Sequence, residues 1–307
     1  MDFAERLSQR ITERDTRIVV GIDPFPNRLP AFLLKNVTPG DTASVSRALH
    51  AFGQMVVESV EPYASAVKFQ ISFYEQWGIP GLMALEQTLA GMAGSDLEVI
   101  MDVKRGDIST TAEAYVRAYL SGPEMSGHHY QAPWQVDAVT LNPYLGEDSL
   151  EPWVEAARSH KKGLFVLVKT SNPGSQSIQD LELKEGGAVT ERVARMLSAM
   201  GEVAIGPSGY SPLGAVVGAN YPETLVTLRQ LLPHSYLLLP GYGAQGGKAE
   251  AIAHAFDDNG LGAVVSASRS VIFAAEPTAS PGDTAKAIAE SARRFRDDVN
   301  RALRQRR

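Results

Sequence analysis

Eight short apolar runs recur along the chain, and segments with the periodicity of amphipathic helices separate them. The runs are Arg17–Asp23, Ser65–Gln70, Leu97–Val103, Val136–Asn142, Gly163–Thr170, Leu213–Gly218, Ser235–Gly241 and Gly262–Ser266. They are continuous rather than alternating, which is typical of strands that are buried on both faces of a sheet. We therefore predict a strand at each of these positions.

The segments between the runs, and one after the last run, carry apolar residues at helical spacing. They are Ser44–Val60, Gly81–Ala93, Thr110–Leu120, Leu150–His160, Val189–Met200, Pro222–Leu232, Lys248–Asp258 and Asp283–Arg304. Strict alternation of strands and helices predicts parallel strands, and eight such units close a (β/α)8 TIM barrel. No linker divides the chain, so we expect one α/β barrel domain over residues 1–307. Residues 1–16 form its N-terminal helix, and residues 283–307 its C-terminal helix and basic tail.

Most of the notable polar residues lie at or just after the carboxyl ends of the predicted strands. They are Asp23, Lys68, Asp102, Lys104, Asn142, Ser171, Gln245 and Arg269. In a parallel barrel these strand ends meet on one face, where active sites are built. The pattern therefore predicts a functional site on that face.

The segment LEVIMDVKRGDISTT, residues 97–111, concentrates charge at the end of an apolar run. Asp102 and Lys104 are two residues apart, so alternation along a strand places their side chains on the same side. Isolated buried charges are costly, so these two must pair or serve chemistry. A structural ion pair does not require the third charge at Asp107, and we therefore favour a site.

Two predicted loops are longer than the usual length of about six residues. Ser121–Pro133 follows the third helix, and Ser171–Gly187 follows the fifth strand on the active face, where a long loop is a candidate lid. Gly241–Gly247 is rich in glycine, which lets backbone amides approach an anion. Because it follows strand seven and Arg269 follows strand eight, we predict that both bind phosphate.

Composition narrows the function classes. Cysteine is absent, which excludes disulfides and thiolate metal sites. A net charge of −6 argues against nucleic acid as a partner. No run approaches the roughly 18 apolar residues of a membrane span, and MDFAERLSQRITERD lacks the apolar run of a signal peptide. We expect a cytoplasmic protein without a membrane partner.

The segment DVKRGDISTT, from Asp102 to Thr111, resembles the D-x-K-x-x-D-I-x-x-T signature of the orotidine 5′-phosphate decarboxylase family. Asp23, Lys68, the SNPG turn and the PGYGAQGG loop match further positions of that family. The KTSNPGS turn and the chain length resemble its longer, second bacterial group (type 2). Arg269 lies in SASRS, which departs from the family's usual V-G-R stretch.

The resemblance implies decarboxylation of orotidine 5′-monophosphate to uridine 5′-monophosphate, the last step of UMP biosynthesis, with no metal and no organic cofactor. It casts Lys104 as the acid that protonates C6, and Asp102 as the carboxylate beside the departing CO₂. Lys68 orders the charged array and contacts ribose, as does Asp23.

The resemblance also implies how the rest of the nucleotide is held. Ser171 hydrogen-bonds the pyrimidine, whereas Gln245 and Arg269 hold the phosphate. Asp107 and Thr111 enter the site of a neighbouring subunit, so a homodimer is expected.

Taken singly, several of these residues have simpler interpretations. Asp107 could support the start of the next helix, and Thr110 with Glu113 matches a capping box. Asp23 with Pro24 could open a turn, and Arg269 could pair structurally. Their joint placement on one barrel face favours a site.

Two other functions compete with the decarboxylase. Related barrels with a similar D-x-K-x-x-D core are Mg²⁺-dependent sugar-phosphate lyases or aldolases, which carry a glutamate ligand where this chain has Lys68. A lysine cannot ligate Mg²⁺, which prefers oxygen. The second alternative is a catalytically silent barrel that binds a nucleotide phosphate, or a purely structural oligomer.

Overall fold

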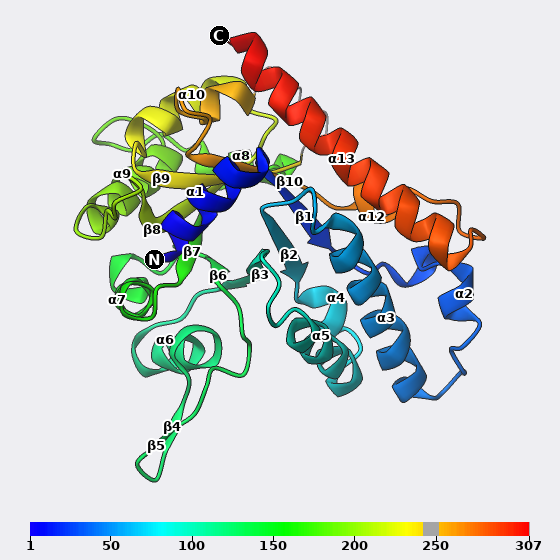
Figure 1. Ribbon diagram of the computed structural model, residues 1–307. Helices are drawn as coiled ribbons and strands as arrows, with labels where there is room; N and C mark the ends of the chain where they lie inside the picture. The colour runs from blue at the N-terminus through cyan, green and yellow to red at the C-terminus, as the bar shows by residue number, and fades with distance from the viewer. Residues whose placement is uncertain (242–251, 307) are drawn as a thin grey trace.

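A closed barrel of eight parallel strands forms the centre of the computed structural model, which describes residues 1–241 and 252–306 (Figure 1). The strands are β1 (Ile18–Ile22), β2 (Ala66–Gln70), β3 (Glu98–Arg105), β6 (Ala138–Leu141), β7 (Gly163–Lys169), β8 (Ser211–Val217), β9 (Ser235–Pro240) and β10 (Ala263–Ala267). Around the barrel they follow the order β1-β10-β9-β8-β7-β6-β3-β2. Each neighbouring pair is parallel, so the predicted (β/α)8 architecture is confirmed.

Helices surround the barrel, most of them between successive strands, with α1 before the first strand and α13 after the last. The longer ones are α1 (Phe3–Arg14), α3 (Thr42–Val60), α5 (Ile79–Gly91), α6 (Ser109–Val116), α7 (Glu151–His160), α9 (Val189–Glu202), α10 (Pro222–Leu231) and α13 (Pro281–Arg306). The short ones are α2 (Ala31–Leu34), α4 (Ser72–Glu75), α8 (Gln176–Gln179) and α12 (Arg269–Ile272). Of the predicted helix Lys248–Asp258, the described part forms a 3₁₀ turn at Ala253–Ala255. Among the described helices, none is long and apolar enough to cross a membrane.

The helix α1 closes the amino-terminal end of the barrel. Asp2 and Glu5 form a reciprocal capping box that starts the helix, and its apolar face joins the side chains inside the barrel. Phe3 meets Phe165 of β7 edge to face, with ring centroids 5.9 Å apart. A Cβ atom at Gly163 would lie 2.2 Å from the Phe3 ring, so glycine is needed there. This end of the barrel is therefore packed core.

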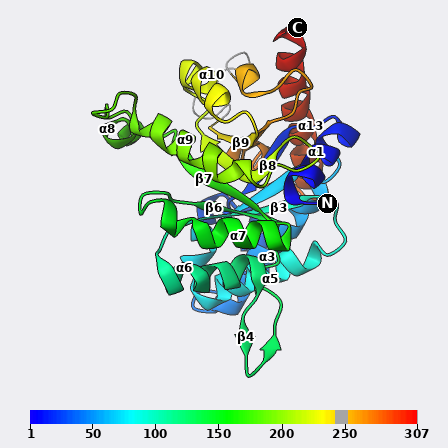
Figure 2. The same cartoon turned by 90° about the vertical axis from the view of Figure 1, so that its left-hand side faces the viewer.

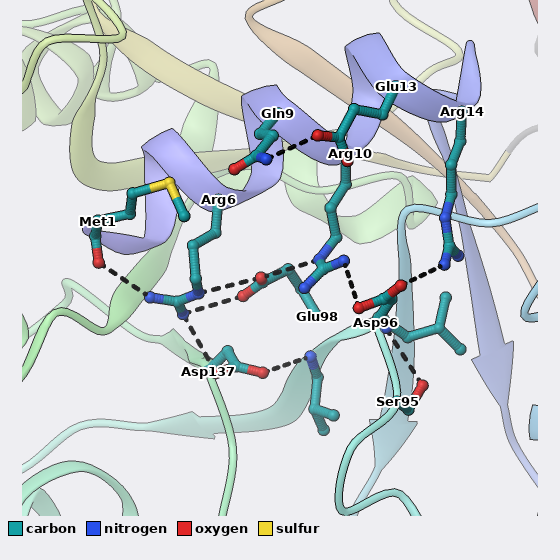
Figure 3. A network of polar contacts seen from close by, with 12 residues as sticks. Met1, Arg6, Gln9, Arg10, Glu13, Arg14, Ser95, Asp96, Glu98 and Asp137 are labelled. Carbon is teal, nitrogen blue, oxygen red and sulfur yellow. Dashed lines mark hydrogen bonds and ion pairs between the residues drawn. The ribbon is translucent and has the colours of Figure 1, made fainter.

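Charged side chains of α1 also hold the first residue of β3 (Figure 3). Arg6 donates to both oxygens of Glu98, with Nε–Oε1 and Nη2–Oε2 distances of 3.1 and 3.0 Å. Arg10 lies 3.4 Å from Glu98 Oε1 and 3.3 Å from Asp96 Oδ1. Arg6 Nη2 also lies 3.2 Å from Asp137 Oδ1. This network ties α1 to the barrel.

The segment predicted as the plain loop Ser121–Pro133 instead contains an antiparallel hairpin of β4 (Glu124–Met125) and β5 (His128–His129). Figure 2 shows it projecting away from the barrel. Ser126 and Gly127 have φ values of 53° and 78°, which suits a two-residue hairpin turn. The prediction of a loop was wrong because strands of two exposed residues are too short to show an alternation of apolar and polar positions.

Candidate functional site

The end of β3 leaves regular strand geometry where its charges begin. Its register with β6 shifts between Met101 and Arg105, and Lys104 has a φ of 45°. A left-handed lysine costs about 1 kcal/mol or more, so the surroundings must hold it. The Lys104 amide donates to Thr140 Oγ1 at 2.9 Å instead of to a strand partner. Asp102 and Lys104 do meet, but through this bulge rather than by the simple alternation that we predicted.

Asp102 binds two ammonium groups. Lys68 of β2 donates to its Oδ2 at 2.9 Å, and Lys104 donates to its Oδ1 at 2.5 Å. The hydroxyl of Thr140 donates to Oδ1 at 2.8 Å. Asp102 and Lys68 are both buried, whereas the Lys104 side chain is 45% exposed. The array thus holds the Asp102 carboxylate in place and leaves the Lys104 ammonium group accessible.

The charges in the array stabilise one another. Burial raises the pKa of the Asp102 carboxyl, but Lys68 and Lys104 outweigh burial and hold that pKa well below its ordinary value. Burial lowers the pKa of Lys68, but the negative charges of Asp102 and Asp23 give a net rise. Asp23 Oδ1 is itself buried and has no hydrogen-bond partner among the described residues. The carboxylate of Asp102 and the ammonium of Lys68 are therefore ionised at neutral pH.

A cavity of about 690 Å³ opens above this array at the carboxyl ends of the strands. Lys68, Asp102 and Lys104 line it, as does the predicted Ser171. Apolar side chains such as Leu238 complete its wall. This volume lies in the range of about 300–1,000 Å³ that is typical of small-molecule sites.

Asn142, another of the predicted strand-end residues, also lines this cavity, whereas Asp23, Asp107, Thr111 and Arg269 lie outside its lining. Asp107 is half-buried just before α6, where its Oδ1 accepts from the Ile108 amide at 2.8 Å, and Thr111 is exposed in the first turn of that helix. Arg269 is exposed at the first position of α12, and its side chain has no hydrogen bond or ion pair with the described residues. Gln245 lies outside the described residues.

The capping box considered for Thr110 and Glu113 is wrong. The N-cap residue of α6 is Ile108, and no side chain caps the helix there. Because the helix begins at Ser109, the two residues lie two positions too far along the chain for that motif.

Thr140 was missed by the sequence reasoning, although it holds both Asp102 and the Lys104 amide. Its signal was present, because it is the polar residue of the otherwise apolar strand AVTL. A buried threonine beside an expected charge array is a natural partner for that array. Gln179 also lines the cavity and was not predicted.

Comparison with known proteins identifies the family. Residues 17–281 match the profile of the orotidine 5′-phosphate decarboxylase/HUMPS family. The chain belongs to this family. The orotidine 5′-phosphate decarboxylase of Rhodopirellula baltica is 43% identical over 274 residues, which cover 89% of each chain. That of Deinococcus radiodurans is 40% identical over 302 residues, which cover 98% of each chain.

The fold of this chain is also similar to that of a solved structure. The OMP decarboxylase of Leishmania donovani superposes with a TM-score of 0.74 at 26% identity, and the alignment covers 99% of each chain. The decarboxylase family that the sequence motif predicted is therefore confirmed.

Proposed function

We propose that this chain decarboxylates orotidine 5′-monophosphate to uridine 5′-monophosphate in pyrimidine biosynthesis, and that Lys104 delivers the proton. The observation that carries the proposal is the array in which Lys68 and Lys104 bind the two oxygens of Asp102 at the base of a cavity. The names of the relatives support the same reaction.

Lys104 meets the central difficulty of this chemistry. When the bond between C6 and the carboxyl carbon breaks, its electron pair stays on C6, where the ring delocalises it poorly. A fixed ammonium group stabilises that charge as it develops and then transfers a proton to C6. Lys104 is left as a neutral amine, CO₂ departs, and the lysine regains a proton from solvent.

Asp102 and its partners prepare Lys104 for this role. Its carboxylate lies beside the departing CO₂ group and, through the 2.5 Å contact, keeps the Lys104 ammonium in place. Lys68 and Thr140 hold the carboxylate from the other sides. Because these groups are fixed before the substrate arrives, little reorganisation is needed during the reaction.

The remaining residues bind the nucleotide in this proposal. Ser171, in the cavity wall, hydrogen-bonds the pyrimidine. Asp23 and Lys68 contact the ribose, and the unpaired buried oxygen of Asp23 supports that role. Arg269 and Gln245 hold the phosphate. The exposed, uncommitted side chain of Arg269 is suited to an anionic ligand.

A homodimer belongs to the same proposal. Thr111 is exposed and Asp107 is half-buried at the start of α6, and neither residue lines the cavity of its own chain. They complete the site of the neighbouring subunit. The cytoplasmic location stays a prediction.

Ultraviolet absorbance of the purified protein with orotidine 5′-monophosphate, with and without EDTA, tests the reaction. We expect conversion to uridine 5′-monophosphate at the same rate in both. Activity that EDTA abolishes would instead indicate the Mg²⁺-dependent lyase branch. Bound uridine 5′-monophosphate without any conversion would indicate a silent phosphate-binding barrel.

A further inference from the structure

The last residue of β7 is a lysine that takes no part in the charged array. Lys169 is 1% exposed, although lysine is among the residues least often buried without a partner. Its Nζ donates to Asp180 Oδ1 at 2.5 Å and lies 4.7 Å from the centroid of the Tyr221 ring. Asp180 follows α8, and Tyr221 follows β8. Lys169 therefore joins two of the loops on the face that bears the cavity.

Asp180 ends a segment that forms one wall of this cavity. Residues 171–180 contribute the following lining residues: Ser171, Asn172, Gly174, Ser175, Ile178 and Gln179. Within these ten residues Ser175 alone is buried, and Ile178 is 53% exposed. Apolar packing therefore contributes little to holding this wall in place, and polar contacts must do so.

The polar contacts are concentrated where the segment returns to β7. Thr170 donates from its amide to Gln179 Oε1 at 2.9 Å, and Gln179 Nε2 donates to the Thr170 hydroxyl, also at 2.9 Å. The Lys169–Asp180 pair is next to these bonds. Two consecutive residues at the end of β7 thus bind two consecutive residues at the end of the segment, and the wall is a closed loop.

We propose that Lys169 is a positioning residue for nucleotide binding, which acts by holding Asp180 and with it the wall 171–180 against the cavity. The ligand is the nucleotide of the proposed function, and the inference rests on that function. Lys169 itself is absent from the lining of the cavity and contacts neither Asp102 nor Lys104. Its effect on the reaction runs through the wall.

The ion pair between Lys169 and Asp180 fastens the wall to the end of β7, and we call this pair the latch. A hydrogen bond between two ionised groups is worth about tenfold or more in the population of the arrangement that makes it. Lys169 is held by the fold, whereas the Asp180 side chain is 47% exposed. Loss of the pair therefore releases the wall and leaves the barrel intact.

Lys169→Met tests the proposal, because methionine fills the buried space without the charge. We expect the KM for orotidine 5′-monophosphate and the Kd for uridine 5′-monophosphate to rise about tenfold, with kcat within about threefold. A wall that contacts ground state and transition state alike changes KM rather than kcat. Lys162→Met is the matched control at the other end of β7, where Lys162 Nζ donates to the Val136 carbonyl at 2.6 Å. That variant should keep both constants.

Asp180→Asn removes the same ion pair at its exposed partner, and it tests the proposal even if Lys169→Met does not fold. We expect the same rise in KM and Kd. Because both substitutions break the same contact, the double variant should have a Kd no higher than that of the single variant with the higher Kd. Constants within twofold of wild type in either folded variant, even with a lowered Tm, would overturn the proposal. A wild-type chain that binds uridine 5′-monophosphate but does not decarboxylate would instead overturn the proposed function, and the Kd values would still test the latch.

Discussion

The strand β3 carries two buried carboxylates, one at its first residue and one in the half that leads to the carboxyl end, and cations hold the two in different ways. Glu98 begins the strand and is bound by Arg6 and Arg10 of α1. Asp102, four residues later, is bound by Lys68 and Lys104. Both carboxylates are nearly inaccessible, so burial and pairing alone do not distinguish a functional end from a structural one.

The surroundings make the difference. Burial and the neighbouring Asp137 raise the pKa of Glu98, and Arg6 and Arg10 only partly offset them. At Asp102 the two lysines outweigh burial and lower the pKa. One end is covered by α1 (Figures 1 and 3), whereas the other opens into the 690 Å³ cavity. The array at Asp102 differs from the one at Glu98 because its charged groups favour the ionised carboxylate and because one of them, Lys104, is accessible from the cavity.

The largest expected effect comes from removing one cation at each end. Lys104→Ala should lower turnover by at least about 10⁴-fold, because it removes both the proton donor and the charge beside C6. Arg6→Ala should keep turnover within about twofold and lower the stability by about 2 kcal/mol. Steady-state kinetics and urea unfolding measure both.

Binding of uridine 5′-monophosphate serves as the control for Lys104→Ala, since a folded variant should still bind it. Near-normal turnover in that variant would remove Lys104 from its proposed role.

Exchanging the carboxylates for amides sharpens the comparison. Asp102→Asn should lower kcat about 10²-fold or more, because the neutral amide no longer fixes the ammonium of Lys104. Glu98→Gln should leave kcat unchanged, since Glu98 lies far from the reacting groups, and should disturb stability less than Arg6→Ala does, since its surroundings already disfavour the ionised form. Equal losses of kcat in the two variants would contradict the distinction between the two ends.

Two arginines provide a smaller contrast. Arg269→Ala should raise the Kd for uridine 5′-monophosphate about 100-fold, which is typical of losing charged hydrogen bonds to phosphate. Arg10→Ala, at the closed end, should change the Tm and leave this Kd within about twofold. Calorimetric titration of both variants makes the comparison, and an unchanged affinity after Arg269→Ala would refute the phosphate role.

The sequence predicted the barrel because buried parallel strands are continuous apolar runs, and each of the eight runs became a strand. It also predicted the array at Asp102, since charges inside such a run need a physical reason. It did not predict that Lys104 would be left-handed, because a bulge depends on the register with β6. The local alternation of side chains contains no such information.

The contacts at the end of the barrel that α1 covers were harder to predict, because they too depend on the tertiary fold. Glu98 is one residue of an apolar run, and nothing local indicates that Arg6, 92 positions earlier, will bind it. The Lys169–Asp180 pair depends likewise on how the chain after β7 returns to the barrel. Sequence patterns identify residues that need partners, but the tertiary fold chooses the partners.

The two carboxylates should also respond oppositely to pH, and this is the smallest effect that we expect. The raised pKa of Glu98 means that the folded chain holds this proton more tightly than the unfolded chain does. Its contribution to stability therefore falls as pH rises above the ordinary value of 4.5. The lowered pKa of Asp102 gives a contribution that is complete above the ordinary value of 3.8 and is lost as pH falls below it.

Urea unfolding of the wild type, Glu98→Gln and Asp102→Asn between about pH 3 and 7 measures these contributions. The stability of the wild type relative to Glu98→Gln should decrease as pH rises above 4.5. Its stability relative to Asp102→Asn should decrease in the opposite direction, as pH falls below 3.8. If both differences changed in the same direction, the two ends of β3 would share one electrostatic environment, and the cavity alone would distinguish them.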